Sequence, residues 1–162
     1  MRTALFGGTD PLLRRAAWAA VHGCLKVTPG ERVLIVTNPA RDVRLIAQAL
    51  YDAALDAQAA PNLICQPRKS LTEFAEPSVF AALAARPDVF ISVTEDKLGR
   101  DRQGTRTPYE SDGRKYDNLL ATNKGNIRLA TLFKLAKDSG IEFTFQPRHE
   151  RQVPAAEVTD RG

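Results

Sequence analysis

Three short, mostly apolar runs recur along the chain without a regular alternation of polar side chains. They lie at 32–37, 62–66 and 88–94, and the first and the third are rich in β-branched residues. A strand that is buried on both faces has this pattern, which is typical of a parallel sheet between two layers of helices. The pattern therefore predicts three buried strands.

Helical periodicity fills the intervals around these runs. The ranges 11–27 and 40–58 each place their apolar residues on one stripe, and a shorter helix is predicted after a cap at Ser78. Strands and helices alternate, so right-handed crossovers make the strands parallel. The predicted fold class is α/β, a three-layer Rossmann-like domain with a mainly parallel sheet of three to four strands flanked by helices.

The organisation of the chain follows from where this pattern starts and stops. We predict one α/β domain at 11–145, a flexible leader at 1–10, and a polar tail at 146–162 that we expect to be disordered. Within the domain, apolar spacing predicts a last helix over 127–139, and the apolar residues of 141–145 predict a fourth strand.

A long segment with few apolar side chains, 95–118, begins where the third strand ends, and we predict that it is a basic loop. Ligands of open parallel sheets bind beyond the carboxyl ends of the strands, so the loop starts at a favourable place for a site. It either borders a pocket for an anionic group or a partner surface, or it is a solvated connector. The residues assigned to this substrate or partner loop are Lys97, Arg100, Asp101, Arg102 and Tyr109.

Composition is that of a soluble globular domain. The chain has 162 residues, 43% hydrophobic and 26% charged, with a net charge of +4. No apolar run approaches the roughly 20 residues that span a bilayer, and the dispersed charge does not predict nucleic-acid binding. We therefore expect a cytoplasmic protein with no membrane or nucleic-acid partner. Cys24 and Cys65 are interpreted as two buried small hydrophobic residues rather than as a disulfide.

Common catalytic motifs do not occur in the sequence. No glycine-rich phosphate loop follows the first strand, and there is no G-x-S-x-G elbow. His22, within a predicted helix, and His149, in the polar tail, do not form a metal-ligand pattern. Ser92 lies inside a predicted strand and is interpreted as a packed hydroxyl. No catalytic residue and no metal ligand is assigned to this chain.

Two segments carry a family resemblance. The first is Cys24–Thr37, a helix end followed by the pattern V-x-P-G-E-x-V-L-I-x-T, and the second is Asp88–Arg102, followed by Pro108-Tyr109 and 113–117. Together they resemble the N-terminal part of the aminopeptidase T family, the thermophilic leucyl-aminopeptidase-like metallopeptidases. The resemblance covers about residues 12–128.

The resemblance implies a cytosolic, homodimeric exopeptidase that releases N-terminal residues from peptides. In that family two divalent metal ions, zinc, cobalt or magnesium, are bound in a C-terminal domain by Glu, His, Asp and Tyr side chains, and none of these ligands can be placed on this sequence. The chain is therefore predicted to be the truncated N-terminal domain of such an aminopeptidase, without a metal of its own and inactive alone. A surface exposed near the helix predicted around 119–136 would cause self-association. The alternative is a stand-alone binding or interaction module for an anionic metabolite or a protein partner.

Overall fold

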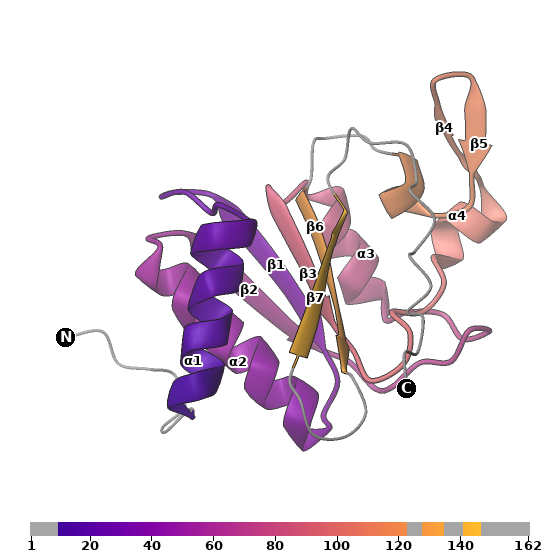
Figure 1. The fold of residues 1–162 in the computed structure, drawn as a ribbon. Coiled ribbons are helices and arrows are strands. Elements are labelled where there is room, and N and C mark those ends of the chain that lie inside the picture. Colours follow the sequence, from indigo (N-terminus) through magenta and orange to yellow (C-terminus); the bar gives the residue numbers. More distant parts are fainter. Residues whose placement is uncertain (1–9, 123–127, 135–140, 147–162) are drawn as a thin grey trace, which may run out of the picture.

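A five-stranded sheet with the order β2-β1-β3-β6-β7 forms the centre of the molecule (Figure 1). The computed structural model describes residues 10–122, 128–134 and 141–146. Neighbouring strands are parallel except for β7, which is antiparallel to β6. The strands of this sheet are β1 (Arg32–Thr37), β2 (Ala60–Cys65), β3 (Val89–Val93), β6 (Arg128–Lys134) and β7 (Ile141–Gln146).

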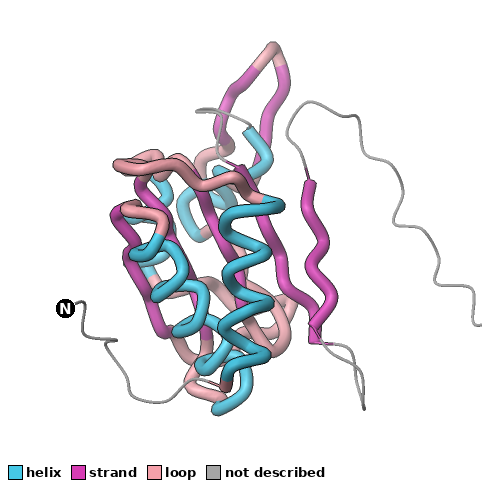
Figure 2. The backbone as a smooth tube through the Cα atoms, turned by 60° about the vertical axis from the view of Figure 1, so that its left-hand side comes forward, coloured by secondary structure: helices cyan, strands magenta, loops and turns pink. Residues whose placement is uncertain are grey.

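Helices cover both faces of the sheet. The helices α1 (Pro11–Trp18) and α2 (Arg41–Asp56) lie side by side on one face, and α3 (Pro77–Ala84) lies on the other (Figures 1 and 2). The alternation of side chains along β1 divides the core accordingly. Val33 and Ile35 pack with the α1 and α2 cluster, whereas Leu34 and Val36 pack with the α3 cluster. The three-layer α/β prediction is confirmed.

The amino ends of β1, β2 and β3 are tied together by short polar contacts. Asp88 accepts a hydrogen bond from the backbone N–H of Arg32 at 2.8 Å. The guanidinium of Arg32 in turn donates to the carbonyl oxygens of Ala85 and Arg86. The carbonyl oxygen of Glu31 accepts from the N–H of Ala60, which aligns the start of β2 with that of β1.

The predicted helix at 127–139 is wrong, because 128–134 form β6. This strand pairs with β3, whose edge away from β1 would otherwise leave its backbone N–H and C=O groups without partners. A fixed pairing of this kind outweighs a weak helical periodicity. The predicted fourth strand at 141–145 is confirmed as β7. Residues 135–140 lie outside the described part.

Other boundaries also differ from the prediction. The helix predicted for 11–27 is an α-helix only to Trp18 and continues as a π-helix, η1 (Ala19–Cys24). The predicted cap at Ser78 is wrong, because α3 starts one residue earlier at Pro77, whose fixed φ suits a first helical turn. Asp10, the last residue of the predicted leader, caps α1 by accepting from the N–H of Leu12. Residues 1–9 and 147–162, the rest of the leader and the tail, lie outside the described residues.

The segment predicted as one loop, 95–118, contains regular structure. It holds α4 (Arg102–Arg106) and a hairpin of β4 (Tyr109–Ser111) and β5 (Arg114–Tyr116), which projects away from the sheet in Figure 1. Asp112 and Gly113 form the two-residue turn, with φ of 53° and 72°. Two positive φ values match the right-handed twist of a hairpin, and an Asp-Gly pair favours them. A short 3₁₀-helix, η2 (Leu119–Thr122), follows.

Both cysteines are free thiols, and both are exposed. The prediction that they are buried is therefore wrong. Cys65 ends β2, which is an edge strand paired only with β1, and Cys24 ends η1. Within the described residues, no helix has the length and apolarity needed to cross a membrane.

The packing of α2 on the sheet generates a stability prediction. Leu50 is 1% exposed within the cluster that joins α1, α2 and the sheet, whereas Leu12 on α1 is 75% exposed. We expect Leu50→Ala to lower the free energy of unfolding by about 3 kcal/mol, since it leaves a cavity. Leu12→Ala should change it by less than about 0.5 kcal/mol. Urea denaturation measures both, and equal losses would contradict the assigned core.

Candidate functional site

The carboxyl ends of β1 and β2 carry two buried amide side chains. Asn38 is 0% exposed and Gln66 is 1% exposed. The Asn38 Nδ2 donates to the carbonyl oxygens of Gln66 at 3.1 Å and Pro67 at 3.4 Å, and its Oδ1 accepts from the N–H of Glu95 at 2.8 Å. One side chain thereby connects the ends of β1, β2 and β3.

Gln66 extends this connection outward. Its Nε2 donates to the carbonyl oxygen of Leu98 at 2.7 Å, and its Oε1 accepts from the N–H of Glu76 at 3.0 Å. The loops that follow β2 and β3 are thus held over the end of the sheet. At this edge, where an open parallel sheet often binds ligands, these two polar side chains serve the fold.

The same two loops pair with each other further along. Lys69 bridges to Lys97 and Phe74 bridges to Arg100 through their backbones. Gly99, which lies between Lys97 and Arg100 in the chain, has a φ of +96°. A Cβ there would lie 2.5 Å from the backbone nitrogen of Ala75. Only glycine allows this close approach, which sets the backbone position of Arg100.

Asp101 is a buried carboxylate, 1% exposed, that anchors the next segment. Its Oδ1 accepts from the N–H groups of Gln103 and Gly104 at 3.0 Å each, which caps α4. Its Oδ2 accepts from the N–H of Leu119 at 3.0 Å and so connects α4 to η2. The hydroxyl of Tyr109 also donates to this carboxylate.

The environment of Tyr109 changes its acidity. Burial, and then the hydrogen bond to Asp101 and the negative charge of Asp101, raises the pKa of Tyr109 to about 12. All three effects favour the neutral phenol. Tyr109 therefore keeps its proton at neutral pH and acts here as a hydrogen-bond donor.

The five residues predicted for the substrate or partner loop do not all meet in one place. Arg100 and Arg102 lie over the ring of Phe74, with their guanidinium carbons 5.2 and 4.6 Å from its centroid. Asp101 is buried and contacts Tyr109. Lys97 is exposed, and its backbone N–H donates to the carbonyl oxygen of Lys69.

Phe74, which holds the two arginines, was not singled out from the sequence. It lies in the connector between β2 and α3, where no periodic pattern points to it. Only the backbone bridge between Phe74 and Arg100, two segments far apart in the chain, brings the ring and the arginines together.

Several neighbouring cations have carboxylate partners. Arg68 pairs with Asp96, Lys69 with Glu76 at 2.7 Å, and Lys115 with Glu110. Among the residues that the structure describes, no ion pair joins Arg100 or Arg102 to a carboxylate. The structure therefore places two exposed guanidinium groups over one ring, that of Phe74, without a carboxylate partner in the described part of the chain.

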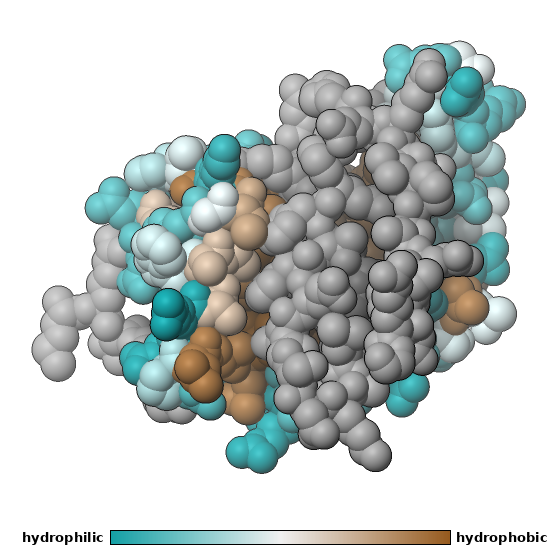
Figure 3. Space-filling view, viewed as in Figure 1, coloured by the Kyte–Doolittle hydropathy of each residue, from teal (hydrophilic) through white to brown (hydrophobic). Residues whose placement is uncertain are grey.

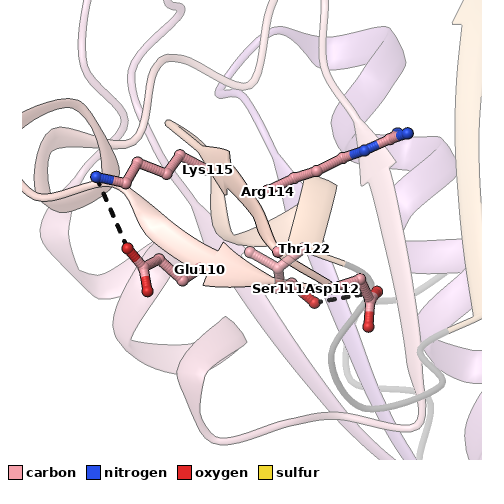
Figure 4. A pocket seen from close by; sticks show the side chains of 7 residues that line it. Glu110, Ser111, Asp112, Arg114, Lys115 and Thr122 are labelled. Carbon is pink, nitrogen blue, oxygen red and sulfur yellow. Dashed lines mark hydrogen bonds and ion pairs between the residues drawn. The ribbon is translucent and has the colours of Figure 1, made fainter.

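Two cavities lie away from this arginine pair. A polar one of about 610 Å³ lies against the hairpin, whose surface is hydrophilic (Figure 3). In it the Glu110–Lys115 pair lies on one side, while Arg114 points the other way (Figure 4). The second, of about 360 Å³, is mostly apolar and lies between the amino end of β1, the middle of β2 and the end of α3.

The described part of the chain contains no group of three or more His, Cys, Asp or Glu side chains placed to hold a metal ion. Two polar atoms in it are buried without a hydrogen-bond partner, the Nε2 of His22 and the Oδ1 of Asp52. His22 stacks on Trp18, with ring centroids 4.6 Å apart. Burial, and then the charge of Asp56, raises the pKa of Asp52.

Comparison with known proteins adds little to this picture. No family model and no curated protein matches the chain. Among solved structures, the fold is similar to that of 2,5-dihydroxypyridine dioxygenase from Pseudomonas putida KT2440, with 15% identity and a TM-score of 0.44 over 74% of this chain. The chain spans about a third, 34%, of the length of that protein. A likeness this weak carries no inference about function.

The amide connection at the strand ends can be tested by substitution. Asn38→Ala removes the partners of three backbone groups, so we expect a loss of about 3 kcal/mol in the free energy of unfolding. The control is Asn62→Ala on the exposed edge strand β2, which should change it by less than about 0.5 kcal/mol. Urea denaturation compares them, and a neutral Asn38→Ala would show that the amide does not hold the strand ends.

Tyr109 gives a pH prediction. Its pKa in the folded protein, about 12, lies above the usual value near 10, so its contribution to stability is complete below pH 10 and is lost as the pH rises through 12. In an ultraviolet titration of the phenols, Tyr109→Phe should remove the phenol that ionises last. Asp101→Asn should lower the pKa of Tyr109, because the carboxylate charge is gone.

Asp117→Asn, on an exposed neighbour, is the control and should leave the titration unchanged. If Tyr109→Phe instead removes a phenol that ionises near pH 10, the assigned contact with Asp101 is wrong.

Proposed function

We propose that this chain forms the N-terminal domain of a metal-dependent, leucyl-aminopeptidase-like enzyme that removes N-terminal residues from peptides. The observation that supports the proposal is the segment Cys24–Thr37, which resembles the aminopeptidase T family. In this proposal the enzyme is a cytoplasmic homodimer.

Three positions of that segment have a clear structural task. Val27 is buried, and its N–H donates to the carbonyl oxygen of Val21 at 2.9 Å. Gly30 takes a φ of +83°, and its N–H donates to the carbonyl oxygen of Gln58. Glu31 closes the turn by accepting from the N–H of Thr28 at 2.8 Å. The segment therefore has a structural role. The proposal assigns the reaction to another part of the enzyme.

The metal ions of such an enzyme do not fit the described residues, because these residues contain no cluster of suitable ligands. The proposal assigns zinc, cobalt or magnesium to ligands in a C-terminal domain of the enzyme, and the described residues take no step of the reaction. Water activation at neutral pH needs a cation held by several ligands. We therefore propose that the chain is inactive by itself.

Self-association stays a prediction. The apolar surface predicted near 119–136 lies largely outside the residues whose side chains are described. Within them, Leu119 and Leu120 of η2 are half-buried against the α3 cluster. Light scattering on concentrated protein would measure the oligomeric state directly.

A second function, a binding module for an anionic ligand, is favoured by one observation. Arg100 and Arg102 share the ring of Phe74 and have no ion pair among the described residues. This arrangement does not depend on the peptidase proposal.

An assay tests the assignment of the reaction. We expect the purified chain to hydrolyse leucine p-nitroanilide with added cobalt, zinc or magnesium no faster than the metal ions alone. Turnover above that background would contradict the proposal that the chain lacks a reaction site. The gene tests the family itself: the DNA downstream of the codons for these residues should encode, in some frame, a segment with clustered Glu, His and Asp. If all frames lack it, the aminopeptidase proposal is withdrawn.

A further inference from the structure

We propose that Arg100 and Arg102, whose guanidinium groups lie over the ring of Phe74, form a binding site for the phosphate or carboxylate groups of a small anionic ligand. The proposal does not rest on the aminopeptidase assignment, and it gives the alternative binding function a definite place and ligand class.

The backbone holds both arginines in place. The N–H of Arg100 donates to the carbonyl oxygen of Glu73 at 2.8 Å, and its carbonyl oxygen accepts from the N–H of Ala75 at 3.0 Å. Arg102 is the first residue of α4 and directly follows the buried cap Asp101. The two side chains therefore start from fixed points on either side of a buried anchor.

The ring orients the guanidinium groups without using their hydrogen-bond donors. A guanidinium over an aromatic ring makes its contact through its charge and flat face, so the N–H groups at its edge stay available. Arg32 is different, because its N–H groups donate to two backbone carbonyl oxygens. Groups oriented before binding lose less conformational freedom when a ligand arrives, which favours affinity.

The local charge favours an anion. Between 97 and 106 the side chains of Lys97, Arg100, Arg102 and Arg106 are cationic, and the single carboxylate, Asp101, is buried and bonded to backbone N–H groups. Glu73 is the acidic residue next to Phe74.

Glu73 remains ionised but is already engaged. Its pKa is lowered, first by hydrogen bonds from Ser70 and then by the charge of Lys69. Its Oε2 accepts from the N–H of Ser70 at 2.8 Å. Glu73 therefore leaves the two arginines available. The paired N–H donors of each guanidinium group match the paired oxygens of phosphates and carboxylates.

The experiment titrates the full chain with pyrophosphate and, separately, with citrate, at constant ionic strength. Arginine side-chain resonances are followed by NMR, and affinities are measured by calorimetry. We expect shifts at Arg100 and Arg102 and a Kd on the order of 1 mM or below for at least one probe. Binding of pyrophosphate alone would identify phosphate recognition, and binding of citrate alone would identify carboxylate recognition. Binding of both would identify general recognition of oxyanions.

Matched variants separate a site from general surface charge. Arg100→Gln and Arg102→Gln should each weaken binding at least tenfold, and Phe74→Leu should weaken it severalfold because the guanidinium groups lose their support. Arg106→Gln removes one equal charge from the same helix without touching the ring and should change the Kd less than twofold. The arginine variants are exposed and keep the test valid if Phe74→Leu fails to fold.

Three results would overturn the proposal. The first is equal weakening by Arg106→Gln and Arg100→Gln, which indicates nonspecific charge. The second is the absence of shifts at both arginines with either probe. The third is binding of poly-glutamate but of neither small anion, which indicates an acidic protein partner. None of these bears on peptide hydrolysis, so the failure of one proposal leaves the other standing.

Discussion

Two buried amide side chains, Asn38 and Gln66, form hydrogen bonds that hold together the carboxyl ends of β1, β2 and β3. The loops beyond this end of the sheet depend on these bonds. Parallel strands cannot be joined by tight turns, so long connections must cross the ends of the sheet and carry their backbone polar groups with them. Leaving such groups buried and unpaired costs free energy. Asn38 and Gln66 supply the missing partners and thereby fix the loops after β2 and β3.

The segment from α4 to η2 is built outward from those loops. Their backbones pair at Phe74 and Arg100, and the close approach at Gly99 requires that no side chain intervene. Asp101 then caps α4 and connects it to η2. A buried carboxylate whose oxygens accept several N–H groups can organise a segment without an arginine or lysine partner. The cations around it are left for other contacts.

The residues with a structural role and the residues of the proposed binding site therefore lie in different parts of the fold. The segment Cys24–Thr37, on which the aminopeptidase proposal rests, makes turns, strand pairing and core contacts. The guanidinium groups of Arg100 and Arg102 lie elsewhere, beyond the carboxyl ends of the strands. The proposed domain role and the proposed anion site therefore rest on different observations, and each can be true alone.

The sequence by itself determined the layers. Unbroken apolar runs at 32–37 and 88–94 and the striped helix at 40–58 indicated buried strands and their cover, because burial leaves a local pattern. Tertiary structure decided what depends on partners distant in the chain. The residues at 128–134 became a strand because the edge of β3 required pairing, and Cys65 is exposed because β2 lies at the other edge. Arg100, Arg102 and Phe74 meet because two loops pair. Local periodicity records which side chains avoid water, but it carries no information about which distant backbone completes a hydrogen bond.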